Sequence, residues 1–397
     1  MDVRADSPER QGPDGGAPGE GRPARLGGAG QARLSILADF TPRGDRSLDL
    51  FFAGLARALA GRGWAVDLTF AGLGPDAYRA ELLPAGVAVS QLPFPFDTRS
   101  AVELARRLFR NRTAVLQTHF IGSFQAGLLA LKPLGAVRKL QIVDHLSGEL
   151  KQLREPLQTL QRLRGVAAGA LVDEYVAVSR FVADRIVRAG VPSRRVRIIE
   201  NGIPVERFTP VQPRNPGELP TVVFAGQLIE QKGLHVLLEA AQGMPAAAHW
   251  VIAGVGRQQR ELEALAQRLG VPARFAGQVD SAELLRRADV VVVPSLWDEA
   301  FGLVAAEAMA AGAAVVVSDA GGLPEVVGEA GVVVPRGDAQ ALRSELERLL
   351  RSPEERARLG AAALRRAAER FTLRRMIDEH VEAVEVLLRD ASTARTA

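Results

Sequence analysis

Short apolar runs alternate with longer amphipathic segments along most of the chain. The first half contains six apolar runs, at 34–38, 65–70, 115–117, 140–143, 176–178 and 197–199. Between them, segments such as Leu50 to Leu59 repeat apolar residues at the spacing of an amphipathic helix. Strands separated by helices predict a parallel sheet with helices on both faces, and function in such sheets gathers at the carboxyl ends of the strands.

A second alternating series follows a proline-rich stretch. Its apolar runs lie at 221–225, 250–253, 274–276, 289–293, 314–317 and 331–334. The stretch itself, residues 206–220, contains four prolines and few apolar residues, which predicts a linker between two domains. Three helical patterns close the chain, at 340–350, 353–370 and 373–388. We therefore predict an α/β protein with two Rossmann-like domains.

These patterns also set the expected limits of each part. Residues 1–31 are rich in Gly, Pro, Arg and Asp without apolar periodicity, and we expect a disordered tail. The predicted parts that follow are a first domain at 32–205, the linker, a second domain at 221–370, a last helix at 371–390 and a short disordered tail at 391–397.

Composition narrows the class of protein. The chain has 397 residues and no cysteine, which excludes disulfides and cysteine-ligated metals. Its net charge of +4 is uneven, because residues 32–190 carry about +7. That surplus predicts an anionic partner, such as a membrane surface or a phosphorylated acceptor, although arginine as a solubilising surface residue explains it equally well. No nucleic-acid motif accompanies the charge, so nucleic acid is not an expected partner.

Two further absences bear on location. No apolar run reaches the ~20 residues that a membrane span needs, and the first residues lack the apolar core of a signal peptide. We expect a cytoplasmic protein, with peripheral contact to the membrane face as an option for the basic first domain. The abundance of Arg, Ala and Gly is typical of a GC-rich bacterial genome.

The densest candidate chemistry lies between Pro294 and Glu325. Glu299 and Glu307, with seven residues between them, stand in a loop after an apolar run and in the small-residue helix that follows. The first amides of that helix have no partner within the helix and suit an anion. These are the amides of Phe301, Gly302 and Leu303. Carboxylates beside an anion site suit a nucleotide-sugar, whose hydroxyls and diphosphate they would hold.

A second candidate motif spans Gly226 to Gly233. It follows a strand and opens a helix, so its glycines allow a close backbone approach and Lys232 supplies a compact positive charge for a diphosphate. Lysine occurs at only four positions, which favours a selected role for Lys232.

Together these motifs resemble the donor site of retaining glycosyltransferases of family four, which have the GT-B fold: two Rossmann-like domains whose parallel sheets face a central cleft. The resemblance covers residues 33 to 390 and is strongest in the second domain. It implies that the last helix crosses back onto the first domain. It also implies that Glu299 contacts the transferred sugar, that Lys232 assists the leaving diphosphate, and that His145 reaches the donor sugar from the first domain.

The resemblance implies further contacts to the donor. Glu307 would hold the ribose hydroxyls, and Gly44 would approach the diphosphate from the first strand–helix loop. The remaining implied donor-binding residues are Phe301, Gly302, Leu303, Gly226, Gln227, Gly254, Gly277 and Val279. The family usually has Arg where this chain has Gln227. His119 is the weaker candidate, on the acceptor side.

The resemblance and the residues together predict the activity and its limits. The expected activity is retaining transfer of a hexose from a nucleotide-sugar to a glycan or lipid-linked acceptor, in cell-envelope polysaccharide or glycolipid biosynthesis. No His, Asp or Glu spacing resembles a metal site, so no metal or other cofactor is expected. A nucleotide-sugar 2-epimerase of the same fold and a non-catalytic nucleotide-sugar-binding protein stay open as alternatives.

Four other polar residues are not expected to take part in the chemistry. Glu325 is expected to cap its own helix. His235, His249 and His380 fall on helix or strand positions without evident partners, and the sequence assigns them no function.

Overall fold

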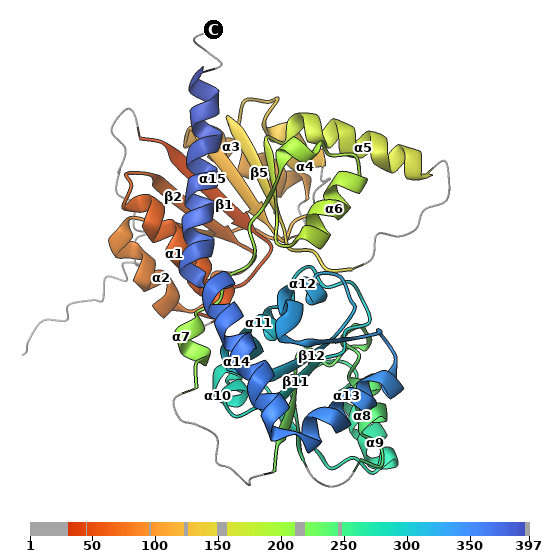
Figure 1. The fold of residues 1–397 in the computed structure, drawn as a ribbon. Coiled ribbons are helices and arrows are strands. Elements are labelled where there is room, and N and C mark those ends of the chain that lie inside the picture. Colours follow the sequence, from red (N-terminus) through yellow and green to blue (C-terminus); the bar gives the residue numbers. More distant parts are fainter. Residues whose placement is uncertain are drawn as a thin grey trace, which may run out of the picture.

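The computed structural model describes residues 31–44, 46–94, 97–122, 126–148, 157–210, 219–244 and 248–393. The predicted N-terminal tail lies almost entirely outside this range, as do most of the linker and residues 394–397. Two lobes are visible in Figure 1, one built from the first half of the chain and one from the second.

The first lobe is organised around a seven-stranded parallel sheet in the order β3-β2-β1-β4-β5-β6-β7. Its strands are β1 Arg33–Ala38, β2 Ala65–Phe70, β3 Ala88–Gln91, β4 Val115–His119, β5 Lys139–Asp144, β6 Glu174–Ala177 and β7 Val196–Ile198. The helices of this lobe are α1 Ser47–Ala60, α2 Asp76–Leu82, α3 Thr98–Arg110, α4 Ala126–Leu131, α5 Leu157–Leu171 and α6 Arg180–Arg188.

The second lobe holds a six-stranded parallel sheet in the order β10-β9-β8-β11-β12-β13. Its strands are β8 Thr221–Ala225, β9 His249–Ala253, β10 Ala273–Gly277, β11 Val290–Val293, β12 Ala314–Ser318 and β13 Val332–Val334. Its helices are α8 Leu234–Ala241, α9 Gln259–Leu269, α10 Ser281–Arg286, α11 Leu303–Ala310, α12 Leu323–Val327 and α13 Ala339–Arg351. The predicted α/β class with two parallel sheets is confirmed.

The strand sequences explain these two layers. The four valines of β11 and all five residues of β12 are buried, as expected for strands covered by helices on both faces. β-branched side chains favour such strands because they pack well on a pleated surface. Both sheets reverse their strand order once, between β1 and β4 and between β8 and β11, and ligands of doubly wound sheets bind at that point.

The last two helices join the lobes. α14 (Pro353–Arg370) lies on the second lobe, and α15 (Leu373–Thr393) runs beside α1 of the first lobe (Figure 1). The ring of His380 on α15 lies 4.9 Å from that of Phe51 on α1. Phe371 lies between the two helices and packs edge-on against Phe301. Phe301 belongs to the loop that follows β11 and carries Glu299, the acidic loop. The chain crossing back thus fixes the second lobe's loop against the first lobe.

Some predicted limits need correction. Residues Val205–Phe208 form a short helix, α7, across the predicted boundary between the first domain and the linker, because Val205 and Phe208 are buried. α15 continues to Thr393, beyond the predicted helix end at 390. β3 was not predicted from the sequence, because none of its four residues is fully buried. An edge strand of this length carries too little apolar pattern to be recognised.

Candidate active site

A pocket of about 200 Å³ opens where the carboxyl ends of the two sheets face each other. From the first lobe it is lined by residues that follow β1, β4, β5 and β7, and from the second by residues at the ends of β8 and β11 and in the segments that follow them. Its lining is Leu48, Phe120, His145, Ser147, Asn201, Phe224, Ala225, Gly226, Lys232, Val293, Ser295, Glu299, Ala300, Phe301, Gly302, Leu303 and Val304. Both points where the strand order reverses therefore contribute to one pocket.

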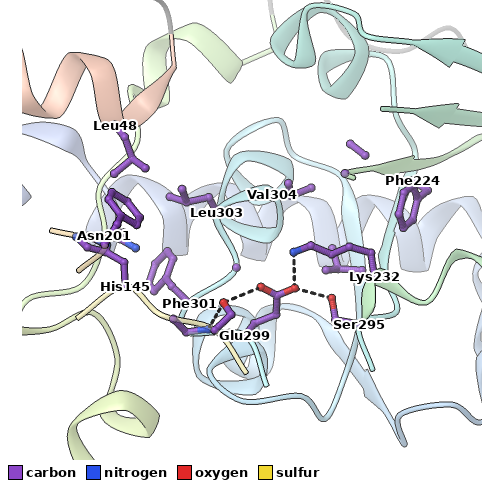
Figure 2. A pocket seen from close by; sticks show the side chains of 17 residues that line it. Leu48, His145, Asn201, Phe224, Lys232, Ser295, Glu299, Phe301, Leu303 and Val304 are labelled. Atoms are coloured by element: carbon purple, nitrogen blue, oxygen red, sulfur yellow. Dashed lines mark hydrogen bonds and ion pairs between the residues drawn. The ribbon is translucent and has the colours of Figure 1, made fainter. Parts of the chain in front are cut away.

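Glu299 is the polar centre of this pocket (Figure 2). The residue is 5% exposed, and its Oε1 accepts hydrogen bonds from Lys232 Nζ at 2.6 Å and from Ser295 Oγ at 2.7 Å. Trp297 Nε1 donates to the same oxygen at 3.1 Å. Burial opposes ionisation of this carboxyl, but the charge of Lys232 and the hydrogen bonds from Lys232, Ser295 and Trp297 outweigh it, so that the pKa of Glu299 lies below its usual value. Glu299 is therefore a buried carboxylate held ionised by one lysine.

The backbone around Lys232 explains why the ammonium reaches that place. Lys232 ends the short 3-10 helix Glu230–Lys232, which stops at Gly233 in a left-handed conformation. A Cβ at Gly233 would lie 1.9 Å from the carbonyl oxygen of Pro294, so only glycine allows this close packing. The Lys232 ammonium also lies 5.6 Å from the ring centre of Trp297. Two interactions thus aim the side chain into the pocket.

The start of α11 forms a second polar wall. Gly302 caps this helix with φ +105°, and the first amides that bond inside the helix are those of Ala305 and Ala306, both to the Gly302 carbonyl. The preceding amides are the unpaired donors that every helix start leaves. Gly302, Leu303 and Val304 line the pocket, so these donors and the helix dipole face it. The pocket therefore combines a fixed carboxylate, an ammonium and a helix start.

Serines of the first lobe close over the acidic loop. Ser147 Oγ accepts from the Ala300 amide at 3.1 Å and donates to Glu299 Oε2 at 3.4 Å. Ser179 Oγ donates to the Ala300 carbonyl at 2.6 Å. The Gly148 amide donates to the Asp298 carbonyl at 2.7 Å. The carboxylate of Glu299 is thus positioned by both lobes, which sequence spacing could not reveal.

His145 reaches the pocket from the first lobe, as the resemblance implied. It lies beside Asn201 in Figure 2 and stacks on Phe120 with ring centres 4.4 Å apart. Its Nε2 is 3.0 Å from Nδ1 of His119. Burial lowers the pKa of His145 to about 3, so the ring is neutral at physiological pH.

The role predicted for His119 needs correction. Its side chain is 0% exposed and does not line the pocket, so it cannot touch an acceptor in this structure. Burial, His145 and His380 lower its pKa well below the usual value. Its contact with the site is indirect, through the hydrogen bond between its Nδ1 and Nε2 of His145.

Glu307 lies outside the lining of this pocket and contacts the first lobe. Ser47 Oγ at the start of α1 donates to Glu307 Oε1 at 3.0 Å. Burial raises the pKa of Glu307 to about 7, although the Ser47 hydrogen bond and the charge of Arg207 oppose that rise. In this structure Ser47 thus occupies the hydrogen-bonding position that a ribose hydroxyl was predicted to fill.

Gly44 does not offer its amide to a ligand. The amides of Arg43, Gly44 and Arg46 all donate to Oδ2 of Asp49, at 3.2, 2.9 and 3.0 Å. Asp49 is fully buried at the third position of α1, where it caps the helix. The predicted diphosphate contact through Gly44 is therefore absent here, because Asp49 turns the loop amides inward. The N3 acidic residue was a capping signal present in the sequence.

The other predicted donor contacts divide between pocket and scaffold. Gly226 lines the pocket, whereas Gln227 is exposed outside it. A Cβ at Gly254 would lie 1.7 Å from the Gly226 carbonyl oxygen, so Gly254 packs the two loops together. Gly277 accepts from the Gly254 amide at 2.7 Å, and Val279 is 41% exposed. Roles for Gln227, Gly277 and Val279 toward a nucleobase stay predictions.

Glu325 and His380 differ from the sequence expectations. Glu325 does not cap its own helix: its two oxygens accept from the amides of Arg180 and Phe181, at 2.8 and 2.6 Å, at the start of α6 in the other lobe. His380 has partners, because its Nδ1 lies 3.4 Å from Gln117 Nε2 and its ring packs on Phe51. An interlobe contact has no local signal, whereas His380 falls on the apolar face of its helix and could have been recognised as buried.

The described part of the chain offers neither a metal-binding cluster nor a membrane-spanning helix. No group of three or more His, Cys, Asp or Glu side chains there could hold a metal ion. No helix among those residues is long and apolar enough to cross a bilayer.

Family models match both lobes. The model described as Glycosyltransferase Family 4 matches residues 51–207, and the one described as Glycosyl transferases group 1 matches residues 206–366. The D-inositol 3-phosphate glycosyltransferase of Xylanimonas cellulosilytica is 32% identical over 370 residues, which cover 82% of this chain and 88% of that protein. The phosphatidyl-myo-inositol mannosyltransferase of Mycolicibacterium smegmatis is 41% identical over 182 residues, 43% of this chain and 46% of that protein.

Solved structures share the fold over nearly the whole chain. Anabaena Alr3699/HepE in complex with UDP-glucose superposes with a TM-score of 0.72 at 18% identity, over 89% of this chain and 99% of that one. WaaG, a glycosyltransferase involved in lipopolysaccharide biosynthesis, gives a TM-score of 0.67 at 18% identity, over 88% of this chain and 99% of that one.

Proposed function

We propose that this chain, a glycosyltransferase that belongs to the group 1 glycosyl transferases of family 4, moves a hexose from a nucleotide-sugar to a hydroxyl of an anionic acceptor and retains the anomeric configuration. The observation that carries the proposal is the Lys232–Glu299 pair, which lies at the start of α11 in the pocket between the lobes. A positive side chain and free helix amides suit a diphosphate, and a buried carboxylate suits sugar hydroxyls.

The Lys232–Glu299 ion pair should break when a donor binds. Lys232 gives its charge to Glu299 in the ligand-free pocket. A diphosphate at the α11 start competes for that ammonium, and Glu299 then keeps Ser295 and Trp297 as donors while Oε2 turns to the sugar. The diphosphate thereby takes the ammonium from the carboxylate, which Ser295 and Trp297 still hold in place for its contact with the sugar.

The transfer step follows from this arrangement. The bond between the anomeric carbon and the diphosphate oxygen breaks, and the electron pair leaves with the diphosphate, whose charge Lys232 and the helix start stabilise. Positive charge develops on the sugar beside the Glu299 carboxylate. The acceptor hydroxyl attacks from the face that the diphosphate leaves and passes its proton to a diphosphate oxygen. Retention of configuration follows from attack on that face.

The acceptor class rests on two supports. Two of the relatives are named for acceptors that contain inositol and phosphate, one free and one in a lipid. Residues 32–190, which form most of the first lobe, carry about +7. We therefore take a phosphorylated polyol as the acceptor, with cell-envelope glycolipid or polysaccharide synthesis as its setting, at the cytoplasmic membrane face.

A thermal-shift screen with UDP, GDP, ADP and their common sugars tests the donor site first. A ligand of the native state raises the melting temperature with the logarithm of its excess over Kd. The proposal expects a shift with one nucleotide family, which Lys232→Met removes. Lys132→Met is the matched control, since Lys132 pairs with Asp173 at 2.7 Å away from the pocket. No shift with any nucleotide would contradict the proposal.

Turnover separates the proposal from its two alternatives. With donor and D-inositol 3-phosphate, transfer gives a glycosylated acceptor and a free nucleoside diphosphate. A 2-epimerase would change the sugar without using the acceptor, and a binding protein would leave the donor intact.

A further inference from the structure

A row of hydrogen-bonded polar side chains crosses the first sheet from its β6–β7 edge to the pocket. The polar row consists of Glu174, Gln141, Gln117 and His119. Gln117 on β4 is in register with Gln141 on β5, and Gln141 with Glu174 on β6, so the three share one face of the sheet. Gln117, His119 and Gln141 are 0% exposed. Burying side-chain amides in an apolar sheet costs free energy unless every hydrogen bond is made. A row of such residues where apolar side chains would pack more simply points to a role beyond stability.

The direction of hydrogen-bond donation along the polar row is set at its outer end, by Glu174. Glu174 is a carboxylate, paired with Arg197 Nε at 2.8 Å, and it can only accept hydrogen bonds. Gln141 must therefore turn its Nε2 toward Glu174, at 2.6 Å. Its Oε1 then faces Gln117 and accepts from Gln117 Nε2. Reversing either amide would place an acceptor against an acceptor.

The same direction continues through the histidines. Gln117 Oε1 faces His119 Nε2 at 2.9 Å, so that this nitrogen must carry the hydrogen. His119 is neutral, because burial lowers its pKa well below the usual value, and its Nδ1 therefore has a lone pair. His145 Nε2 lies 3.0 Å from that lone pair and must donate to it. The nitrogen of His145 left for a ligand is Nδ1, as an acceptor.

We propose that the polar row fixes the tautomer and orientation of His145, so that this residue accepts a hydrogen bond from a hydroxyl of the transferred sugar and disfavours a carboxylate at that place. The inference rests on the proposed function and deepens it, since it assigns His145 as a specificity determinant and the polar row as its positioning residues. The donor class that follows is a hexose with a free hydroxyl rather than a uronic acid. In this arrangement His145 accepts from the sugar and does not donate to it.

Ring nitrogens labelled with ¹⁵N test the polar row in ligand-free protein. The chain has five histidines, and single His→Gln variants assign their signals. We expect wild-type His119 and His145 each to show one tautomer, with hydrogen on Nε2. A wild-type His145 with hydrogen on Nδ1 overturns the proposal.

Two substitutions on β4 separate positioning from general damage. Gln117→Met keeps the side-chain length but removes the acceptor of His119, and we expect mixed tautomers of His119 and His145. Thr118→Val is the control, because Thr118 is equally buried on the opposite face and its Oγ1 has no partner among the described residues. Thr118→Val should keep the wild-type tautomers. An unchanged His145 tautomer in Gln117→Met contradicts the positioning role.

Paired donors test the specificity. Titrations compare UDP-glucose with UDP-glucuronate and GDP-mannose with GDP-mannuronate. A carboxylate facing the Nδ1 lone pair loses a hydrogen bond and its solvation, so we expect wild type to bind the neutral sugar at least about tenfold more tightly. In Gln117→Met that ratio should fall toward one. Equal or tighter binding of the uronate by wild type overturns the specificity.

Donor binding and the histidine tautomers can each contradict one proposal without deciding the other. If neither pair binds wild type, the proposed donor site is wrong and the specificity with it, while the tautomer spectra still decide whether the polar row sets His145. If donors bind but the tautomers are mixed, the donor site stands and the polar row is only structural.

Discussion

Binding of a nucleotide-sugar should release protons near neutral pH through Glu307. Burial raises the pKa of this carboxyl to about 7 in the ligand-free protein, so about half of the molecules carry the proton at pH 7. The ribose diol that the family resemblance places at Glu307 would replace Ser47, donate hydrogen bonds to the carboxylate and favour its ionised form. The bound pKa should return to the usual range or below it. Binding at pH 7 should therefore release about 0.5 proton.

The same linkage fixes the pH dependence of affinity. If only ionised Glu307 binds, the apparent Kd contains the factor 1 + 10^(pKa − pH), which is about 11 at pH 6 and about 1.1 at pH 8. We expect Kd to fall about tenfold between those values. The imidazoles of His145 and His380 do not contribute, since burial lowers the pKa of each to about 3 and both rings stay neutral.

Isothermal titration with the donor sugar-nucleotide measures both quantities. Titrations in two buffers with different ionisation enthalpies count the protons, and a sugar-nucleotide avoids the terminal phosphate ionisation of a free nucleoside diphosphate. Glu307→Gln cannot ionise and should abolish both the proton release and the pH dependence. A wild-type Kd that is equal at pH 6 and pH 8, or a tenfold change that persists in Glu307→Gln, would refute the reasoning.

The raised pKa of Glu307 should also make the free energy of unfolding depend on pH. The folded-state pKa of Glu307 lies above its unfolded value, so protonation stabilises the folded state below about pH 4.5, and this contribution is lost as the pH rises through about 7. Between those values the free energy of unfolding of wild type should fall relative to that of Glu307→Gln, by at most about 3 kcal/mol.

Three further changes have defined outcomes. Lys232→Met should reduce transfer at least about a hundredfold and raise the pKa of Glu299, read from its ¹³C carboxyl shift, because the carboxylate loses its ammonium. Glu325→Ala should lower the melting temperature by a few degrees, from about 1 kcal/mol of lost helix capping, and widen the separation of the lobes in X-ray scattering. Gly254→Ala should destabilise by more than about 2 kcal/mol in denaturant titration, since its Cβ would meet the Gly226 carbonyl oxygen at 1.7 Å and φ is +132°.

Matched variants separate these effects from general damage. Lys132→Met removes an equally paired lysine, and transfer should persist. Gly127→Ala places a Cβ in ordinary contact, 4.0 Å from Ala101, inside α4 and should be neutral or stabilising. An unchanged Glu299 pKa in Lys232→Met, an unchanged lobe separation in Glu325→Ala, or an unchanged stability in Gly254→Ala would each contradict the corresponding contact.

The sequence predicted what depends on local pattern. Strands Ala65–Phe70 and Thr221–Ala225 were located to the residue, because their apolar runs are bounded by turn residues. Glu299 and Lys232 were recognised from the motifs around them, and they meet in the pocket although 67 residues separate them. The rule that function lies at the carboxyl ends of strands placed His145 correctly on the pocket wall.

What escaped prediction depends on how distant segments meet. Ser47 contacts Glu307 across 260 positions, and Ser147 contacts Glu299 across 152, so neither pairing has a local signature. Gly44 had the expected place in its loop, but Asp49 decides which way the loop amides point. The register of three strands aligns the amides behind His145, and no single strand sequence reveals that alignment.

Proton NMR of one transfer reaction shows whether this pocket performs retaining transfer and whether Lys232 is needed for it. Wild type and Lys232→Met are incubated with D-inositol 3-phosphate and whichever sugar-nucleotide raises the melting temperature, and the anomeric signal of the product is followed. The account predicts that wild type forms a product with the anomeric configuration of the donor and that Lys232→Met forms almost none. An inverted product, or a Lys232→Met variant as active as wild type, would contradict it.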